Sequence, residues 1–356
     1  MRSTLVKLHR WLGLGCGLVF LVVCLSGSLL IFEDEISSFL DRSLIQSSQH
    51  PGSLDRLHTS ATAQLREGEW IQRIYLPSGK VRLRGKDEMR HLYFSPDEAT
   101  YLGEGSELMR SVIKFHRSLF LSDLGRWITL TSCLFVIGTL LTGLKLWLPK
   151  SLKRLASALT IKRSASRRRF VLDLHRVLGV VVLLPLLLIA TTGLNYSKIS
   201  DTLRQGLFSA LGEEPIPDPK PVTPSEAAPL PLDQLVEQAA LVYPEAELSC
   251  IEFSNSPDEA VKVRFRHPGQ PGHFGQSNVM MDPRTGEVLR SLNALELPVG
   301  HQFVYVWALP LHRGEVFGLP QRILWLMVVL IGAGLPLTGM WLWYTRRSRV
   351  RDKRES

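Results

Sequence analysis

Residues Leu8–Gly27 read LHRWLGLGCGLVFLVVCLSG, and a second copy, LHRVLGVVVLLPLLLIATTG, occupies Leu174–Gly193. In both copies a histidine, His9 or His175, comes 18 residues before the closing glycine. An apolar run of about 20 residues is long enough to span the hydrocarbon core of a bilayer, which is roughly 30 Å thick. An ionisable residue at the mouth of such a run is uncommon and indicates a function.

A second duplicated pattern follows each copy. His116 comes 27 residues before Gly143 in LTGLKLW, and His312 comes 27 residues before Gly339 in LTGMWLW. All four of these histidines are followed directly by an arginine. The chain is therefore a tandem duplication of a unit in which two histidine-bearing helices flank a loop.

Four apolar runs carry Trp or Tyr near their ends, as the belt residues of a membrane–water interface do. A buried core helix is the alternative for any single run, but four runs with such belts indicate a membrane protein. We expect transmembrane helices at Trp11–Phe32, Trp127–Leu148, Leu172–Tyr196 and Ile323–Tyr344.

The formal net charge of +9 is unevenly distributed. Residues 1–10, 149–171 and the tail from Thr345 together carry +15, so the rest of the chain carries −6. The excess of Lys and Arg on one side predicts cytoplasmic termini and a cytoplasmic middle connector, with both long loops periplasmic. Because the basic residues gather at membrane boundaries, we expect a lipid bilayer, and no nucleic acid, as partner.

The two long loops resemble each other. Each predicts a helix followed by short strands with polar turns, so we expect two small α+β modules. Seven prolines between positions 213 and 231 predict a stiff linker before the second module. The predicted helices are Leu54–Arg66 and Leu232–Tyr243, and the main strands are Ile71–Leu76, Lys80–Arg84, Arg90–Phe94, Leu248–Phe253, Ala260–Arg266 and Asn278–Met281.

The predicted fold class is thus a membrane all-α four-helix bundle with two small α+β periplasmic modules, formed by internal tandem duplication. The expected segments alternate between membrane and loop. They are helix 1 (1–32), module 1 (33–115), helix 2 (116–148), the basic cytoplasmic connector (149–171), helix 3 (172–196), the Pro-rich linker with module 2 (197–311), helix 4 (312–345) and the cytoplasmic tail (346–356).

The motifs LHRWLG, LTGLKLWLPK, LHRVLG, LHRGEVFGLPQR and LTGMWLW occur in this order along nearly the whole chain. Together they resemble the PepSY-associated transmembrane family, and MDPRTGEVL resembles the end of a PepSY module. Members of that family include bacterial inner-membrane ferric-siderophore reductases and other iron-regulated membrane proteins. The resemblance implies PepSY-like modules and haem-dependent reduction on the periplasmic side of the inner membrane.

A b-type haem inside a helix bundle needs two axial ligands on facing helices, and imidazole is the usual choice. Pseudo-twofold symmetry pairs His9 with His175 and His116 with His312, so we expect two b haems per chain. The following arginines could bind the haem propionates, and ordinary snorkelling to the interface is the alternative. These candidate propionate partners are Arg10, Arg176, Arg117 and Arg313.

The outer histidines need a break in the helix. As a continuous helix, 27 residues would measure about 40 Å, which exceeds the hydrocarbon core. We expect Gly125 in the first half, and Gly318 with Pro320 in the second, to fold the histidine back. His301 is a further candidate, as a substitute ligand or part of a substrate site.

No GxGxxG after a strand, P-loop or HExxH occurs, so no NAD, flavin or ATP site is predicted. Electrons would come from an unidentified cytoplasmic donor or from quinol. The predicted function is a haem-dependent ferric reductase that transfers electrons to a ferric siderophore or another Fe(III) chelate and releases Fe(II). The alternatives are a non-enzymatic PepSY-type sensor or inhibitor, and a siderophore transporter.

Overall fold

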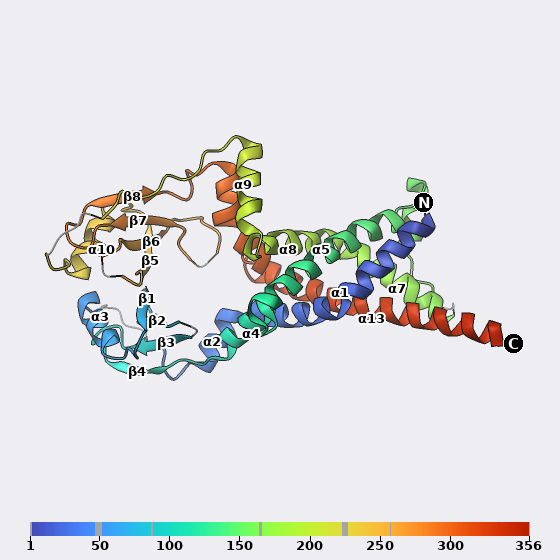
Figure 1. Cartoon of the computed structure of the whole chain (residues 1–356), viewed down its shortest axis with the longest axis horizontal. Helices are drawn as coiled ribbons and strands as arrows, with labels where there is room; N and C mark the ends of the chain where they lie inside the picture. Colours follow the sequence, from blue (N-terminus) through green and yellow to red (C-terminus); the bar gives the residue numbers. More distant parts are fainter. Residues whose placement is uncertain are drawn as a thin grey trace. The chain divides into compact units, whose positions relative to one another are not determined.

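The computed structural model describes residues 2–46, 52–86, 88–163, 166–222, 227–256, 258–272 and 274–355. The chain divides into two compact units (Figure 1). The helical unit consists of Met1–Glu33, Arg110–Gln205 and Ala308–Ser356, and the sheet unit consists of Asp34–Met109 and Gly206–Trp307.

In the helical unit, α1 packs along α5 and α13, and α13 also packs on α7. The division between the units falls within α4 and α9. The helices are α1 (Arg2–Leu30), α4 (Leu108–Ser118), α5 (Ser122–Trp147), α6 (Leu155–Ala158), α7 (Arg167–Val181), α8 (Leu183–Gly193), α9 (Ser200–Leu211), α12 (Ala308–Arg313) and α13 (Leu319–Glu355), with 3-10 turns at Leu152–Arg154 and Leu194–Tyr196.

The long helices bury small and branched side chains against one another and expose large apolar ones. Val136 of α5, Val182 and Val328 of α13 are buried in one cluster. Leu18 of α1 and Leu184 of α8 are 67% and 73% exposed on the outer surface. Continuous exposed apolar surface of this kind is stable in lipid and costly in water. The helical unit therefore forms the membrane-embedded part of a multi-pass protein.

The predicted membrane all-α four-helix bundle with two small α+β modules is wrong in both its parts. Within the described residues, three helices are long and apolar enough to cross a membrane: α1, α5 and residues Leu319–Arg346 of α13. The predicted span Leu172–Tyr196 is instead divided between α7 and α8, which bend by 58° at a short break. Pro185 explains the break, because a proline cannot donate to the carbonyl four residues earlier and its ring displaces that carbonyl.

Both outer histidines lie on short helices that precede a sharp turn. Between α4 and α5 the chain turns through Leu119 and Phe120, which both have positive φ angles. Gly125 then lies so close to the Ser118 carbonyl that a Cβ at this position would overlap it. In the second half, Gly314 and Gly318, with φ of 78° and 66°, make the equivalent turn between α12 and α13. The predicted breaks are thus present, the first slightly before Gly125.

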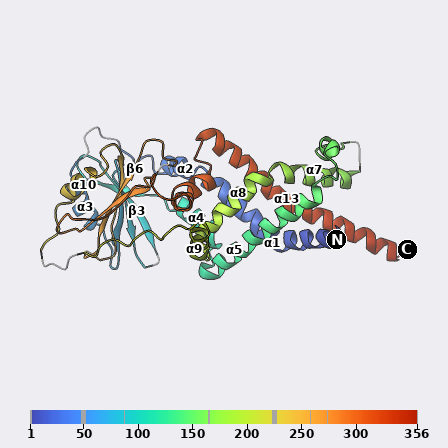
Figure 2. The ribbon, with the colours of Figure 1, turned by 90° about the horizontal axis from the view of Figure 1, so that it is seen from above.

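The sheet unit contains one antiparallel sheet in the order β4-β3-β2-β1-β5-β6-β7-β8. Helices α3 and α10 lie on the same side of it (Figure 2) and cover the apolar core. The strands are β1 (Trp70–Tyr75), β2 (Lys80–Arg84), β3 (Met89–Phe94), β4 (Tyr101–Glu104), β5 (Glu247–Glu252), β6 (Val261–Arg266), β7 (Ser277–Met281) and β8 (Val288–Leu292); the helices are α2 (Glu33–Leu40), α3 (Leu54–Thr62), α10 (Leu232–Ala240), α11 (Val299–Gln302) and a π-helical turn at Phe303–Trp307.

The strands predicted in the two loops are present, but they do not form two separate modules. β1 pairs with β5, with Arg73 opposite Glu252 and Tyr75 opposite Cys250. Each four-stranded half alone would leave a row of unpaired N–H and C=O groups on its edge strand. Pairing of the two edges satisfies these groups and joins the cores, so the duplication produces a single eight-stranded sheet.

Helices α3 and α10 also cap each other across the duplication. The Asp233 carboxylate accepts hydrogen bonds from the N–H of Leu54 (2.8 Å) and from the Ser53 hydroxyl (2.6 Å). Reciprocally, the Asp55 carboxylate accepts from the N–H of Leu232 (2.7 Å). Each carboxylate thus satisfies free N–H groups at the other helix's N-terminus. This exchange fixes the two halves of the sheet unit in register.

Candidate functional site: two pairs of histidines

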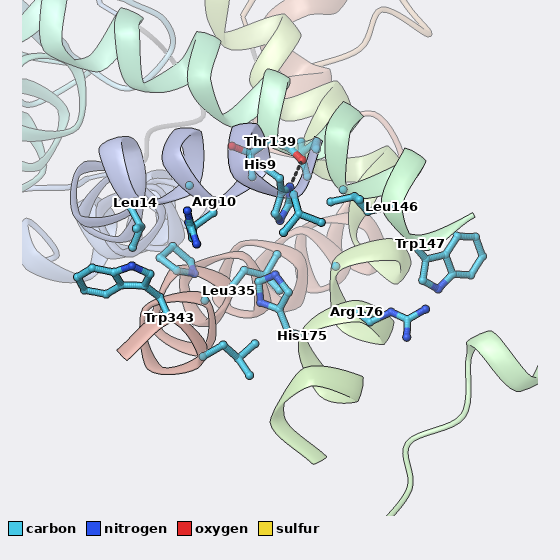
Figure 3. Close-up of a pocket in the computed structure, with 18 of the residues that line it drawn as sticks. His9, Arg10, Leu14, Thr139, Leu146, Trp147, His175, Arg176, Leu335 and Trp343 are labelled. Carbon is cyan, nitrogen blue, oxygen red and sulfur yellow. Dashed lines mark hydrogen bonds between the residues drawn. The ribbon is translucent and has the colours of Figure 1, made fainter. Parts of the chain in front are cut away.

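The helical unit brings His9 of α1 beside His175 of α7. The ring centres are 6.2 Å apart and the planes are almost perpendicular, at 83°. The two rings face each other across a cavity, with Arg10 and Arg176 on either side of them (Figure 3). His116 of α4 and His312 of α12 form a second pair, with ring centres 6.4 Å apart. The structure thus brings together the neighbours that the duplication predicted, and their role as ligands stays a prediction.

All four histidines are held by the same short motif on another helix. In each case the Nδ1–H donates to the hydroxyl of the residue before a glycine and to the carbonyl four residues before that glycine. His9 contacts Thr142 Oγ1 and the Thr139 carbonyl, both at 3.1 Å. His116 contacts Ser26 Oγ at 3.0 Å and the Val23 carbonyl at 3.1 Å.

The second half of the duplication repeats these contacts. His312 lies 3.3 Å from Thr192 Oγ1 and 2.9 Å from the Ile189 carbonyl. His175 lies 2.8 Å from Thr338 Oγ1 and bonds to the backbone of Leu335. The glycines of the four motifs are Gly143, Gly27, Gly193 and Gly339.

These partners fix the tautomer of each imidazole. The backbone carbonyls can only accept a hydrogen bond. The hydroxyls already donate to their own helices, as Thr142 does to the Gly138 carbonyl at 2.7 Å and Ser26 does to the Val22 carbonyl at 2.9 Å. The proton therefore resides on Nδ1, and Nε2 carries the lone pair that a metal ion needs.

In three of the four motifs the glycine makes room for the ring. A Cβ on Gly143 would lie 3.1 Å from Cε1 of His9, and the same distance would separate Gly27 from His116 and Gly193 from His312. A side chain at these positions would displace the imidazole.

The spacing of both pairs fits one metal ion between two imidazoles. Each bond from a metal ion to an imidazole nitrogen is about 2 Å long, so two opposed ligands have ring centres about 6 Å apart. Among the described residues no group of three or more His, Cys, Asp or Glu could hold a metal ion. Two histidine donors without a third are the number that a six-coordinate haem iron takes from the protein.

The cavity around the first pair has the volume of a ligand pocket, and several arginines line it. Its volume is about 480 Å³, within the range of ligand pockets. Apolar side chains and four glycines line it, and its basic residues are Arg2, Arg10, Arg168, Arg176 and Arg346. The Nε–H groups of Arg10 and Arg168 are buried without a hydrogen-bond partner. A carboxylate such as a haem propionate would satisfy both groups.

Of the arginines that follow the second pair of histidines, Arg313 already has carboxylate partners within the protein. The guanidinium of Arg313 forms ion pairs with Glu33 (3.2 Å) and Glu315 (2.6 Å). Both carboxylates therefore compete with a haem propionate for the guanidinium of Arg313, which is one of the four predicted propionate partners. Arg322, buried in α13, donates to the Ile31 carbonyl at 2.9 and 2.6 Å and so fixes the end of α1. Arg117 lies on α4 directly after His116.

His301 belongs to the sheet unit, whereas both histidine pairs belong to the helical unit. Its ring stacks on Phe208 at 3.8 Å, and its Nδ1–H donates to Glu213 at 2.7 Å. His301 is not a member of either histidine pair, and its role as a substitute ligand or in a substrate site stays a prediction.

The family model described as "PepSY-associated TM region" matches residues 6–346. The chain belongs to this family. Comparison with curated proteins returned no match. The two histidine pairs and the four motifs that hold them lie within the matched part of this PepSY-associated protein.

The hydroxyl–glycine motifs are the functional feature that sequence reasoning missed. Ser26-Gly27, Thr142-Gly143, Thr192-Gly193 and Thr338-Gly339 are visible as a fourfold repeat. The pattern that could have revealed them is a Ser or Thr directly before each of these four glycines. Arg2 and Arg168 were also missed, although each precedes the histidine of its copy, His9 or His175, by seven residues. Arg346 was missed because it lies in the basic tail, and only the fold brings it to the cavity.

Proposed function

We propose that this protein is a haem-dependent membrane oxidoreductase that transfers electrons to an Fe(III) chelate, such as a ferric siderophore, and releases Fe(II). The observation that carries the proposal is the arrangement of the two histidine pairs. In both pairs the Nδ1–H is bound to a partner helix, the Nε2 lone pairs are available, and the ring centres are separated by the span of one metal ion.

The positions of the pairs along α1 support electron transfer across a membrane. His9 is near the start of this helix, and Gly27, which contacts His116, is near its end. Eighteen residues of continuous helix measure about 27 Å, close to the thickness of the hydrocarbon core. Two b haems would divide this distance into shorter steps, and a single haem would not.

The chain's own residues would bind and orient the cofactor. His9 with His175, and His116 with His312, would be the axial ligands, and the Thr and Ser hydroxyls would fix their ring orientation. Arg10 and Arg168 are placed to bind propionates of the first haem. A haem with two imidazole ligands exchanges one electron at its iron. We propose an inner-membrane location with cytoplasmic termini, and a cytoplasmic or quinol electron donor.

A haem measurement separates this proposal from its alternatives. A PepSY-type sensor or a transporter needs no haem, although either could use the sheet unit to bind a ligand. Protein purified from haem-replete cells should contain two haems per chain by the pyridine haemochrome assay. In liposomes with a reductant trapped inside, it should reduce an external Fe(III) chelate, detected with a membrane-impermeant Fe(II) chromophore. Haem-free protein would overturn the proposal.

A further inference from the structure

One face of the sheet carries an unusual concentration of positive charge. α3 and α10 cover the opposite face, where the apolar residues of each strand lie. Residues directly opposite one another on paired strands point to the same face. The register therefore identifies two adjacent rows that cross seven strands on the side of the sheet opposite α3 and α10. The first row is His91, Arg82, Arg73, Glu252, Lys262, Met280 and Arg290; the second is Tyr93, Lys80, Tyr75, Cys250, Arg264, Asn278 and Leu292.

These two rows, called the basic face below, contain six Lys or Arg residues and a single carboxylate, that of Glu252. Glu252 lies at the centre, in ion pairs with Arg73, with Arg264 at 3.0 Å and with Lys262 at 3.7 Å. Burial opposes ionisation of Glu252, but these three cations outweigh it and lower its pKa. One carboxylate cannot neutralise three cations, so the centre of the face keeps a positive charge.

Aromatic rings hold some of these cations in place. The Lys80 ammonium lies 5.8 Å from the centre of the Tyr75 ring and 5.6 Å from that of Tyr93. The Arg82 guanidinium lies 5.3 Å from the Tyr75 ring, and its Nε–H donates to His91 at 3.1 Å. Cation–π contacts fix a side chain while they leave its charge intact. At the β3 end, Asp41 accepts from the Tyr93 hydroxyl at 2.9 Å.

The face also contains buried donors that lack an acceptor. The Nε–H groups of Arg73 and Arg290 are buried and have no hydrogen-bond partner. A buried donor without an acceptor is costly, and an anionic oxygen would remove the cost at both positions. The side chains of Arg73 and Arg264 are each 23% exposed, so a ligand can still reach them. A neutral ligand would not compensate the positive charge of the basic face, whereas an anionic ligand would.

We propose that the basic face binds a small polyanionic metal chelate, of the carboxylate or catecholate class, through its guanidinium and ammonium groups. The inference rests on the proposed function for the identity of the metal, Fe(III), because the charge pattern specifies only an anion. It adds the substrate class: chelates that carry negative charge bind here, and cationic or neutral hydroxamate chelates do not.

The test measures binding with redox-inert Ga(III) complexes, so that it does not depend on electron transfer. Full-length protein in detergent is titrated with a trianionic Ga(III) tris-catecholate and, separately, with the monocationic Ga(III) complex of desferrioxamine B. The trianion should bind, and the monocation should not. Raising the salt concentration from about 0.05 to 0.5 M should weaken binding, because salt screens exposed charges.

Matched variants test the face itself. Lys80→Gln and Arg82→Gln should each weaken binding of the trianion about tenfold, the value of a charge-assisted hydrogen bond. Glu252→Gln should strengthen it, and a misfolded variant could not produce this gain. Arg56→Gln, on the exposed side of α3, is the control and should have no effect.

Equal affinity for the two complexes, an Arg56→Gln effect equal to that of Arg82→Gln, or unchanged binding in Glu252→Gln would overturn the inference. Binding of an acidic peptide in place of the chelate would also overturn it. The haem content of the same preparations is measured in parallel. Absent haem with intact binding would refute the proposed function alone, and two haems without binding would refute only this inference.

Discussion

A methyl group added to Gly143 should press on the ring of His9, whereas the same methyl on Gly339 should leave His175 in place. The added carbon would lie 3.1 Å from His9 Cε1 in the first case and 3.6 Å from His175 Cε1 in the second. Carbon atoms pack best at about 3.5–4.0 Å, so the His9 ring must move by about 0.4 Å. Metal–ligand distances tolerate about 0.2 Å. Gly143→Ala should therefore displace an axial ligand, and Gly339→Ala should not.

The expected loss of haem affinity in Gly143→Ala is about 10- to 100-fold, the usual effect of disturbing the groups that orient a metal ligand. The assay is transfer of haem to excess apomyoglobin, followed by the haem remaining per chain. Gly143→Ala should lose one haem rapidly and keep the other, and Gly339→Ala should keep both. Alanine stabilises a helix interior by about 1 kcal/mol relative to glycine at either position, so a weakened helix cannot explain the difference. Equal haem loss from the two variants would show that contact between the added methyl group and the His9 ring does not determine haem retention.

Three further predictions concern the pairs, the sheet and the topology. His9→Ala and His175→Ala should each remove the same haem from the reduced-minus-oxidised spectrum, and His116→Ala should remove the other; loss of one common haem in His9→Ala and His116→Ala would contradict the pairing. Two hydrogen bonds from a buried arginine lower the pKa of Glu69 to about 2, so this carboxylate stabilises the sheet above the unfolded pKa of about 4.3, and the stabilisation is lost as pH falls towards 2. Glu69→Gln should therefore accelerate hydrogen exchange in β3 strongly at pH 7 and much less at pH 3, and an equal effect at both would contradict this. A reporter fused to the C-terminus should be cytoplasmic and one inserted in residues 213–222 periplasmic; the reverse would invert the direction of electron transfer.

The histidine pairs could be predicted because the duplication constrains them. A residue and its repeat-equivalent lie across a pseudo-twofold axis, so His9 and His175 are neighbours even though they are 166 positions apart. The hydrogen-bond partners of each ring were harder to predict from the sequence. His9 bonds to Thr142, 133 residues away on another helix, and nothing in local periodicity specifies which helix faces it.

The errors in the fold have two physical causes. The strands of each loop follow from alternation and turn residues, but the pairing of β1 with β5 depends on how two distant segments meet, which local patterns do not contain. The break between α7 and α8 was missed because the apolar run has the length of a complete span, and Pro185 was counted as one apolar residue among many. Prolines within apolar segments have to be read as backbone constraints as well.

Haem stoichiometry combined with a low-temperature electron paramagnetic resonance spectrum tests whether each of the two histidine pairs holds one haem. Protein purified from haem-replete cells should contain two haems per chain, with low-spin ferric signals from both sites, since each iron would have two imidazole ligands. His175→Ala should halve the low-spin signal. Protein without haem, or a low-spin signal that is unchanged in His175→Ala, would show that the two pairs are not haem ligands.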